Sequence, residues 1–210
     1  VYLVNGHGLL SSRQFYVTNG EGLMVCLGNS ITNARAENQK PVFTTLDQTY
    51  AQNPSHDNVT LTGAHNLSAG TAVYNAAFAY YNLCSSSTPF RASVSTERGN
   101  FFRNNLNYNQ TQQSRIFKVY LSHGKNPQNG SFAYAVAANQ NGQAPLRASS
   151  LPIARVVNLA GVQAVQFQDG SGAVVLHEKG SSWTSASRTY SATHVPALFF
   201  FGPENATSET

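Results

Sequence analysis

The sequence is poor in charge: Asp, Glu, Lys and Arg together make up 10% of its 210 residues, against about 25% in typical soluble domains. Asn, Gln, Ser, Thr, Gly and Tyr take their place. Disordered chains are usually more charged and less aromatic, whereas this chain keeps 41% hydrophobic and 11% aromatic residues. This composition therefore predicts a folded protein that is either extracellular or has a surface largely covered by neighbouring proteins.

Several other features are missing, and each absence excludes a class of protein. The longest apolar run near the end, residues 195–201, contains Pro196 and is far too short to cross a bilayer. No long segment has helical periodicity, and no P-loop, dinucleotide fingerprint or Gly-x-Ser-x-Gly motif is present. The six histidines are not spaced as metal pairs. We expect no membrane span, no cofactor, no metal and no nucleic-acid partner.

Cysteine is also scarce, with Cys26 and Cys84 alone. Structural zinc takes four ligands, so these two residues cannot form such a site by themselves. In a secreted chain they either pair or remain buried thiols, and we predict that they lie close enough to form a disulfide. Five sequons permit N-glycosylation without requiring it: Asn58, Asn66, Asn109, Asn129 and Asn205.

The net charge of +4 is concentrated in residues 91–125. This stretch holds six basic residues against the single acidic residue Glu97, and aromatic residues lie nearby. A basic stretch of this kind can bind an acidic polymer, although it is also compatible with a solvated strand and loop. The predicted carbohydrate-binding residues are Arg98, Arg103, Arg115, Lys118, Lys125 and His123. For His123 a structural role in a turn is the alternative to ligand contact.

Alternating apolar residues predict strands along most of the chain. The clearest is 115–121, in which Phe117, Val119 and Leu121 share a face, followed by a loop over 122–130. In 131–137 three alanines share one face, which indicates close packing against another sheet. Further strands are expected at 14–18, 22–27, 42–46, 58–61, 72–83 and 194–201, with a hairpin formed by 162–168 and 173–178.

Short strands separated by Gly, Asn and Pro turns predict an all-β fold, an antiparallel β-sandwich. Residues 1–201 are expected to form one domain, and residues 202–210 a flexible polar tail.

Several segments, in order, resemble the central β domain of polysaccharide lyase family 8, the hyaluronate, chondroitin and xanthan lyases. Residues 12–16 and 24–31 resemble the family's "K-S-W-F … L-G-S-x-I" strands, and 41–48 resemble "E-T-T-x-x-Q/N". Residues 72–81 are similar to "W-x-x-H-x-x-x-x-Y-Y", without its Trp and His. Residues 121–134 are similar to "H-G-x-x-P … Y-x-Y", and 162–165 to "x-Q-A-V". The similarity covers roughly residues 10–180 and implies part of a lyase-type super-sandwich.

In that family an Asn, a His, a Tyr and an Arg on a helical domain carry out the elimination, and a Glu near the start of the β region helps to position them. The resemblance places none of these residues in this sequence. It therefore implies a secreted, non-catalytic β protein of extracellular structure or self-assembly. A binding module for acidic polysaccharides and a subunit of an active lyase are the alternatives.

The resemblance also implies that strands and a helical domain cover the family's sandwich in places where this sequence has no counterpart. Open sheet edges are rarely left bare. We therefore expect copies of the chain, or a partner chain, to complete the sheet. Head-to-tail strand addition between copies would produce a filament.

Overall fold

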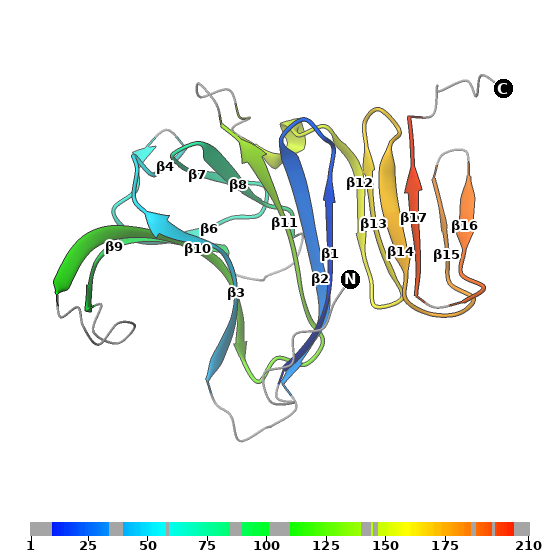
Figure 1. Cartoon of the computed structure of the whole chain (residues 1–210), viewed down its shortest axis with the longest axis horizontal. Helices are drawn as coiled ribbons and strands as arrows, with labels where there is room; N and C mark the ends of the chain where they lie inside the picture. Colours follow the sequence, from blue (N-terminus) through cyan, green and yellow to red (C-terminus); the bar gives the residue numbers. More distant parts are fainter. Residues whose placement is uncertain are drawn as a thin grey trace.

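The computed structural model describes residues 10–33, 40–57, 59–84, 90–100, 110–139, 144, 147–185, 188–194 and 196–203. These residues form three antiparallel sheets stacked side by side, with a small hairpin at one end (Figure 1). The 3-10 turn η3 (Ala148–Ser150) is the one helical element among them. The predicted all-β, antiparallel sandwich is confirmed, and no described helix is long and apolar enough to cross a membrane.

The middle sheet has seven strands in the order β1-β2-β11-β8-β7-β4-β5. Their bounds are β1 Leu10–Thr18, β2 Leu23–Asn33, β11 Gly130–Ala138, β8 Phe78–Asn82, β7 Ala72–Asn75, β4 Ser55–His56 and β5 Val59–Thr60.

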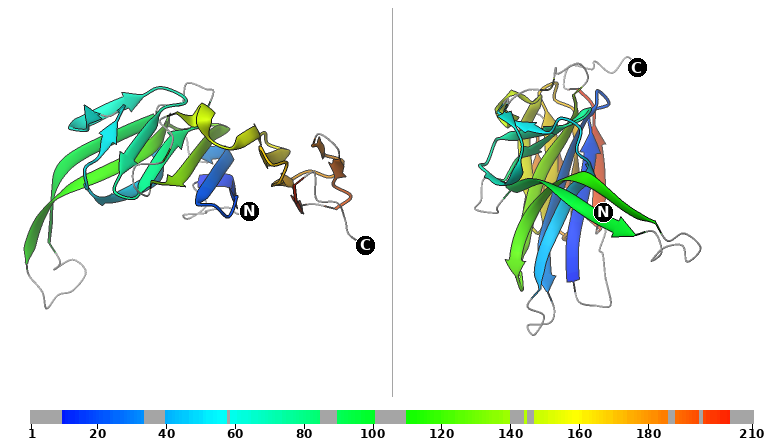
Figure 2. Two further views of the ribbon diagram at one scale, coloured as in Figure 1. Left: turned by 90° about the horizontal axis from the view of Figure 1, so that it is seen from above. Right: turned by 90° about the vertical axis from the view of Figure 1, so that its left-hand side faces the viewer.

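The sheet that we call the outer sheet has the order β3-β10-β9-β6. Its strands are β3 Pro41–Tyr50, β10 Thr111–Lys125, β9 Phe90–Asn100 and β6 Gly63–Leu67. β9 and β10 run past their neighbours as a curved hairpin that projects from the body (Figure 2).

On the other side of the middle sheet lies the C-terminal sheet, in the order β12-β13-β14-β17, which is accompanied by the β15-β16 hairpin. The bounds are β12 Ile153–Asn158, β13 Val162–Phe167, β14 Gly172–Leu176, β17 Ala197–Phe201, β15 Ser182–Thr184 and β16 Thr189–Ser191.

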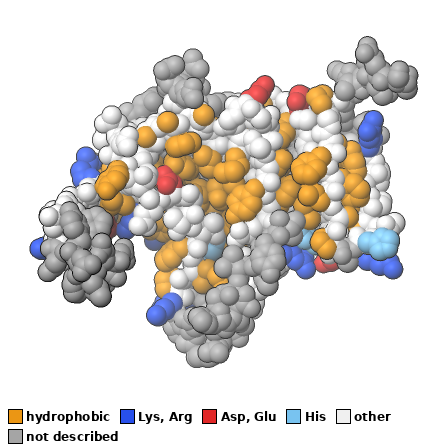
Figure 3. Space-filling model, viewed as in Figure 1, with side chains coloured by type: hydrophobic (Ala, Val, Ile, Leu, Met, Phe, Trp, Pro, Cys, Tyr) orange, Lys and Arg blue, Asp and Glu red, His pale blue; other side chains and the backbone are white. Residues whose placement is uncertain are grey.

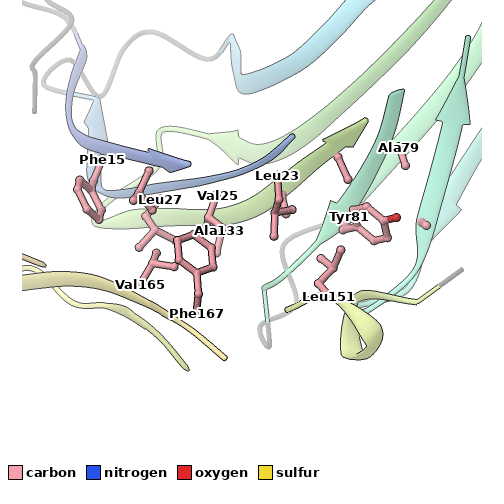
Figure 4. Close-up of a cluster of buried hydrophobic side chains, with 14 of the residues drawn as sticks. Phe15, Leu23, Val25, Leu27, Ala79, Tyr81, Ala133, Leu151, Val165 and Phe167 are labelled. Atoms are coloured by element: carbon pink, nitrogen blue, oxygen red, sulfur yellow. The ribbon is translucent and has the colours of Figure 1, made fainter. Parts of the chain in front are cut away.

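The middle sheet is buried on both faces. Leu23, Val25 and Leu27 of β2 pack toward the C-terminal sheet, against Val165 and Phe167 (Figure 4). A second cluster lies between the middle and outer sheets, and a third lies beneath β15 and β16. Strands with two buried faces lose simple alternation, as β2 does.

The three alanines predicted to mediate close packing do so. Ala133, Ala135 and Ala137 belong to the cluster that faces the C-terminal sheet. The opposite face of β11 carries Phe132 and Tyr134, which pack toward the outer sheet.

The predicted disulfide is wrong, because Cys26 and Cys84 are both buried, free thiols. Cys26 lies in the cluster beneath the outer sheet and Cys84 in the cluster beneath the C-terminal sheet, so the two thiols occupy opposite faces of the middle sheet. β11 separates their positions: Cys26 pairs with Tyr134, and the Cys84 sulfur accepts a hydrogen bond from the Ala133 amide (3.1 Å). Burial raises the pKa of Cys26 to about 11.

Two other expectations are corrected. The segment 72–83 is a hairpin of β7 and β8 rather than one strand, and Ala76 stands at its turn with φ 51°. The loop expected to begin at Ser122 begins later, because β10 continues to Lys125. The hairpin expected at 162–178 is confirmed as β13 and β14.

Candidate functional site

The basic stretch predicted from the sequence folds mainly into the β9-β10 hairpin, whose register decides where each side chain lies. Phe117, Val119 and Leu121 of β10 are fully buried beneath the outer sheet. Since side chains alternate along a strand, Lys118 lies on the opposite face, which we call the outer face. Arg115 shares the face of Phe117, at a position beyond the core.

The structure therefore divides the predicted site residues. Arg98 pairs with Gln113, and Arg115 pairs with Thr96. Both positions alternate with those of the outer face, so both side chains belong to the opposite face of the hairpin. Lys125 lies at the far end of β10, opposite Pro41. Arg103 lies outside the described residues. The six predicted residues do not form one patch, although cationic side chains do gather over the β9-β10 end of the molecule (Figure 3).

A hollow of about 520 Å³ lies across β3, β10 and β9. Two predicted residues, Arg98 and Lys118, line it. The other lining residues are Gln48, Thr49, Tyr50, Glu97, Gly99, Asn100, Gln112, Ser114 and Ile116. The side chains are mainly amides, hydroxyls and charges around one aromatic ring, a composition that suits a sugar better than an apolar ligand.

Lys118 and Glu97 form an ion pair in this hollow, with 2.8 Å between Nζ and Oε1. The hydrogen bonds from Lys118 and then Ser95 lower the pKa of the Glu97 carboxyl. Arg98 also borders the hollow, but its side chain alternates with those of the outer-face residues, so on this face Lys118 and Glu97 contribute one charge of each sign. An acidic ligand can compete with Glu97 for the ammonium group, because the pair is exposed to solvent.

Sequence reasoning noted aromatic residues near the basic stretch, Tyr120 among them, but missed the aromatic residues that β3 adds to the outer face. Tyr50 of β3 is 62% exposed and pairs with Ile116 beside the hollow. Further along, the Phe43 and Tyr120 rings meet edge to face at 5.3 Å, and Tyr120 pairs with Arg91 of β9. The strand β3 is about 70 residues before β10, so no local pattern connects them.

His123 is turned away from this face. Its Nε2 lies 2.8 Å from the Thr44 hydroxyl, and its ring lies 6.3 Å from the Phe132 ring. Burial lowers the pKa of the imidazole, which makes His123 a poor cation for an acidic ligand.

The most buried tyrosine hydroxyls are occupied. Tyr80 donates to Asp47 Oδ2 at 2.5 Å, and burial is the main reason that the pKa of Tyr80 is raised. Burial likewise raises the pKa values of Tyr81 and Tyr134. A phenol must lose its proton to act as a base, and these three are held in the neutral form.

Two sequons can be placed. Asn66 is exposed on β6, and Asn129 is exposed in the turn between β10 and β11, with φ 57°. Asn58, Asn109 and Asn205 lie outside the described residues. Within the described part of the chain, no group of three His, Cys, Asp or Glu side chains is arranged to hold a metal ion.

The stacked sheets have the architecture of a lyase super-sandwich. The family model for the super-sandwich domain of polysaccharide lyase family 8 matches residues 12–147. The chain belongs to this family.

Named relatives agree with this assignment. The chain is 27% identical over 124 residues to chondroitinase-AC of Pedobacter heparinus. The aligned segment covers 56% of this chain and 17% of that protein.

Solved structures show the same fold. A chondroitinase AC lyase studied as oligosaccharide complexes superposes with a TM-score of 0.70 at 18% identity, covering 88% of this chain and 27% of that one. For a Paenibacillus xanthan lyase the TM-score is 0.69 at 14% identity, covering 88% and 19%. For the Streptomyces coelicolor A3 chondroitin AC lyase the TM-score is 0.60 at 17% identity, and the superposition covers 85% of this chain and 23% of that one. The chain thus spans less than a third of each relative.

Proposed function

We propose that this chain is a secreted, non-catalytic β-sandwich that binds acidic polysaccharide on the outer face of its outer sheet. The hollow around Lys118 and Tyr50 carries the proposal, because it combines an exposed ring, amide and hydroxyl groups and an ammonium group that solvent reaches. The similarity to proteins named for chondroitin and xanthan cleavage supports an acidic polysaccharide as the ligand. The low charge of the chain supports secretion.

The titratable groups of the chain support the proposal that it has no catalytic activity alone. General acid and base groups must be positioned together at the scissile bond. In the hollow the one carboxylate, Glu97, is paired with Lys118, and its lowered pKa makes it a weak base. The buried tyrosines named above are held as neutral phenols by their surroundings.

Two measurements on the purified chain test the proposal. Elimination at a uronic acid creates a conjugated double bond that absorbs in the ultraviolet, so absorbance should stay flat with hyaluronan, chondroitin or xanthan. Calorimetry should detect binding of at least one of these polymers, and binding should weaken with salt. A steady, protein-dependent rise in absorbance would exclude the non-catalytic role, and the absence of binding to all three would exclude the ligand class.

Paired variants locate the binding face. Lys118→Gln and Tyr50→Ala should each weaken binding several-fold. Arg115→Gln removes the same charge as Lys118→Gln from the opposite face of the same strand and should change affinity little. Equal losses for Lys118→Gln and Arg115→Gln would show that net charge alone attracts the polymer and that the hollow is not the site.

A second candidate function is the β part of an active lyase whose helical part is supplied separately. It is favoured by the superposition of 85–88% of this chain on complete lyases. Purification of the native protein, with mass analysis of every chain that accompanies it and an absorbance assay on chondroitin, tests it. Activity that co-elutes with a second, helical chain is the expected result for this candidate.

Self-association is proposed as an additional property. β17 lies at one end of the C-terminal sheet and pairs with β14. It exposes Leu198 (49%) and Phe200 (74%), and hydrophobic side chains gather over this sheet in Figure 3. An end strand with exposed apolar side chains favours pairing with another chain.

A further inference from the structure

A second group of polar side chains lies at the β6 side of the outer sheet, apart from the hollow at Lys118. It borders a hollow of about 570 Å³ between the β4-β5 turn, the β6-β7 connection and η3. The residues with polar side chains that matter here are His56, Asp57, Asn66, Ser68, Arg147 and Ser149.

Both ring nitrogens of His56 face hydrogen-bond acceptors. Nδ1 lies 2.8 Å from the carbonyl oxygen of Ala72, which can only accept, so Nδ1 carries a hydrogen. Nε2 lies 3.3 Å from Asp57 Oδ2, which as a carboxylate also accepts. In the neutral ring Nε2 would carry a lone pair, and this lone pair would repel the carboxylate oxygen. Both contacts are favourable when His56 is protonated and positively charged.

Asp57 is shared between two cations. Its other oxygen, Oδ1, lies 3.2 Å from Nη1 of Arg147. This contact uses one edge of the guanidinium group, whereas a bidentate pair would use two parallel N–H groups. The Arg147 side chain is 52% exposed, so it can turn further donors toward a ligand. With His56 protonated, the cluster carries two positive charges and one negative charge.

Asp57 is held in place by the backbone. β4 and β5 pair through Ser55 with Thr60 and His56 with Val59, which leaves a two-residue turn of the kind that favours positive φ. Asp57 has φ 48°, a conformation that Asp and Asn tolerate better than most residues. Asp57 thus stands at the end of β4, where its carboxylate contacts both cations.

The surrounding hydroxyl and amide groups can donate hydrogen bonds. The Ser68 and Ser149 hydroxyls and the Asn66 amide border the hollow. Tyr74 of β7 is the other titratable group near the pair. Its pKa is raised chiefly by burial, with opposing effects from Asp57 and Arg147. Donors around an excess positive charge suit an anionic group.

The register connects this cluster to the proposed glycan face. Asn66 of β6 pairs with Arg91 of β9, and Arg91 pairs with Tyr120 of β10. Neighbouring strands lie about 5 Å apart, so the line from Tyr120 to Asn66 crosses the sheet in about 10 Å and ends at the second hollow.

We propose that the His56, Asp57 and Arg147 cluster is an anion subsite that takes a carboxylate or sulfate group of an acidic polysaccharide. The subsite extends the binding face of the proposed function, on which this inference rests. Arg147 and protonated His56 contact the anion, and Asp57 competes with it.

The subsite can be tested without a polymer. The His56 ring signals, assigned in NMR spectra of the whole chain with a His56→Gln variant, should shift on titration with glucuronate or with sulfate, and should not shift with glucose. Which of the two anions produces the larger shift identifies the preferred group. No response of His56 to either anion would overturn the inference.

Three variants complete the test, each verified as folded by circular dichroism. Arg147→Gln should abolish the His56 response and lower hyaluronan affinity several-fold. Asp57→Asn keeps a residue that tolerates positive φ, removes the competing charge and should raise anion affinity. Arg188→Gln removes an exposed arginine of the β15-β16 turn and should change nothing. An unchanged response in Arg147→Gln would overturn the subsite.

The outcomes separate this inference from the proposed function. If hyaluronan binds equally to wild type and Arg147→Gln, and Lys118→Gln is impaired, the glycan face stands and the subsite fails. If hyaluronan does not bind, and the His56 signals still respond to glucuronate in an Arg147-dependent manner, the subsite stands and the polymer ligand fails.

Discussion

Gly28 of β2 lies so close to Phe132 of β11 that a Cβ atom at Gly28 would come within 2.1 Å of the Phe132 ring. The two residues pair directly across the middle sheet. Gly28 falls within the "L-G-S-x-I" resemblance, so the motif has a steric meaning: the glycine leaves room for an aromatic ring buried beneath the outer sheet.

Replacement of Gly28 should destabilise the fold. Gly28→Ala forces the Phe132 ring to move within a packed core, and such overpacking costs about 1–3 kcal/mol of unfolding free energy. Urea unfolding measures the loss. Gly99→Ala is the control, because it lies in a strand and a Cβ there would meet no atom within 4 Å. Similar stability for the two alanine variants would contradict the steric explanation.

Asn158 of β12 joins the C-terminal sheet to the middle sheet. Its amide donates to the Gly28 and Phe132 carbonyls at 3.0 and 2.8 Å, and its oxygen accepts from Asn29 and Gln163 at 3.2 and 2.9 Å. Asn158→Ala leaves these partners unsatisfied and should cost about 1–3 kcal/mol in urea unfolding. Gln168→Ala, which loses one hydrogen bond of 3.4 Å, should cost much less.

Acid should destabilise the protein through two half-buried histidines, His123 and His177. Burial lowers the pKa of His123, and burial together with Arg13 lowers that of His177. The unfolded chain therefore binds more protons below about pH 6.5, so this contribution to stability is full above that pH and is lost as pH falls toward the folded pKa values. The urea midpoint should drop between about pH 7 and pH 5.

The histidine variants identify the source of that acid effect. His123→Gln should reduce the pH dependence of the urea midpoint, whatever it does to the midpoint itself. His65→Gln, at an exposed position of β6, provides the comparison. Parallel pH curves for wild type and His123→Gln would assign the acid effect to other groups.

Association of copies should depend on β17. Phe200→Asp places a charge on the exposed apolar strand and should shift the protein toward the 22.6 kDa monomer in light scattering at micromolar concentration. Phe43→Asp alters an exposed aromatic residue on the outer sheet and should leave the association unchanged. A monomeric wild-type chain would rule out self-association.

Local pattern predicted the strands that bury one face. In β10 the alternation of Phe117, Val119 and Leu121 with polar residues is clear, and the structure confirms it. β9 was not predicted, because its apolar residues, Phe90, Ala92 and Val94, lie in its first half and a polar run follows. The strand is stabilised by its long ladder with β10. The β7-β8 turn was missed because Ala76, a residue with no turn preference, occupies it.

The proposed binding face was only partly predictable. The alternation that identified β10 also separates Arg115 from Lys118, so the division of the basic residues was present in the sequence. The position of Tyr50 beside Ile116 was not, because it depends on β3 pairing with β10. The approach of Arg147 to Asp57 likewise depends on tertiary packing across about 90 residues of chain.

The double burial of the middle sheet has an evolutionary consequence. Most positions of β2 and β11 are buried, on both faces of the sheet. At these positions a substitution must keep the side-chain volume, whichever face the side chain is on. The outer face of β3, β9 and β10 is under no such constraint. Related chains can diverge rapidly in ligand preference on that face while the central strands stay nearly fixed, and a library restricted to those outward positions is a practical route to new polysaccharide specificities.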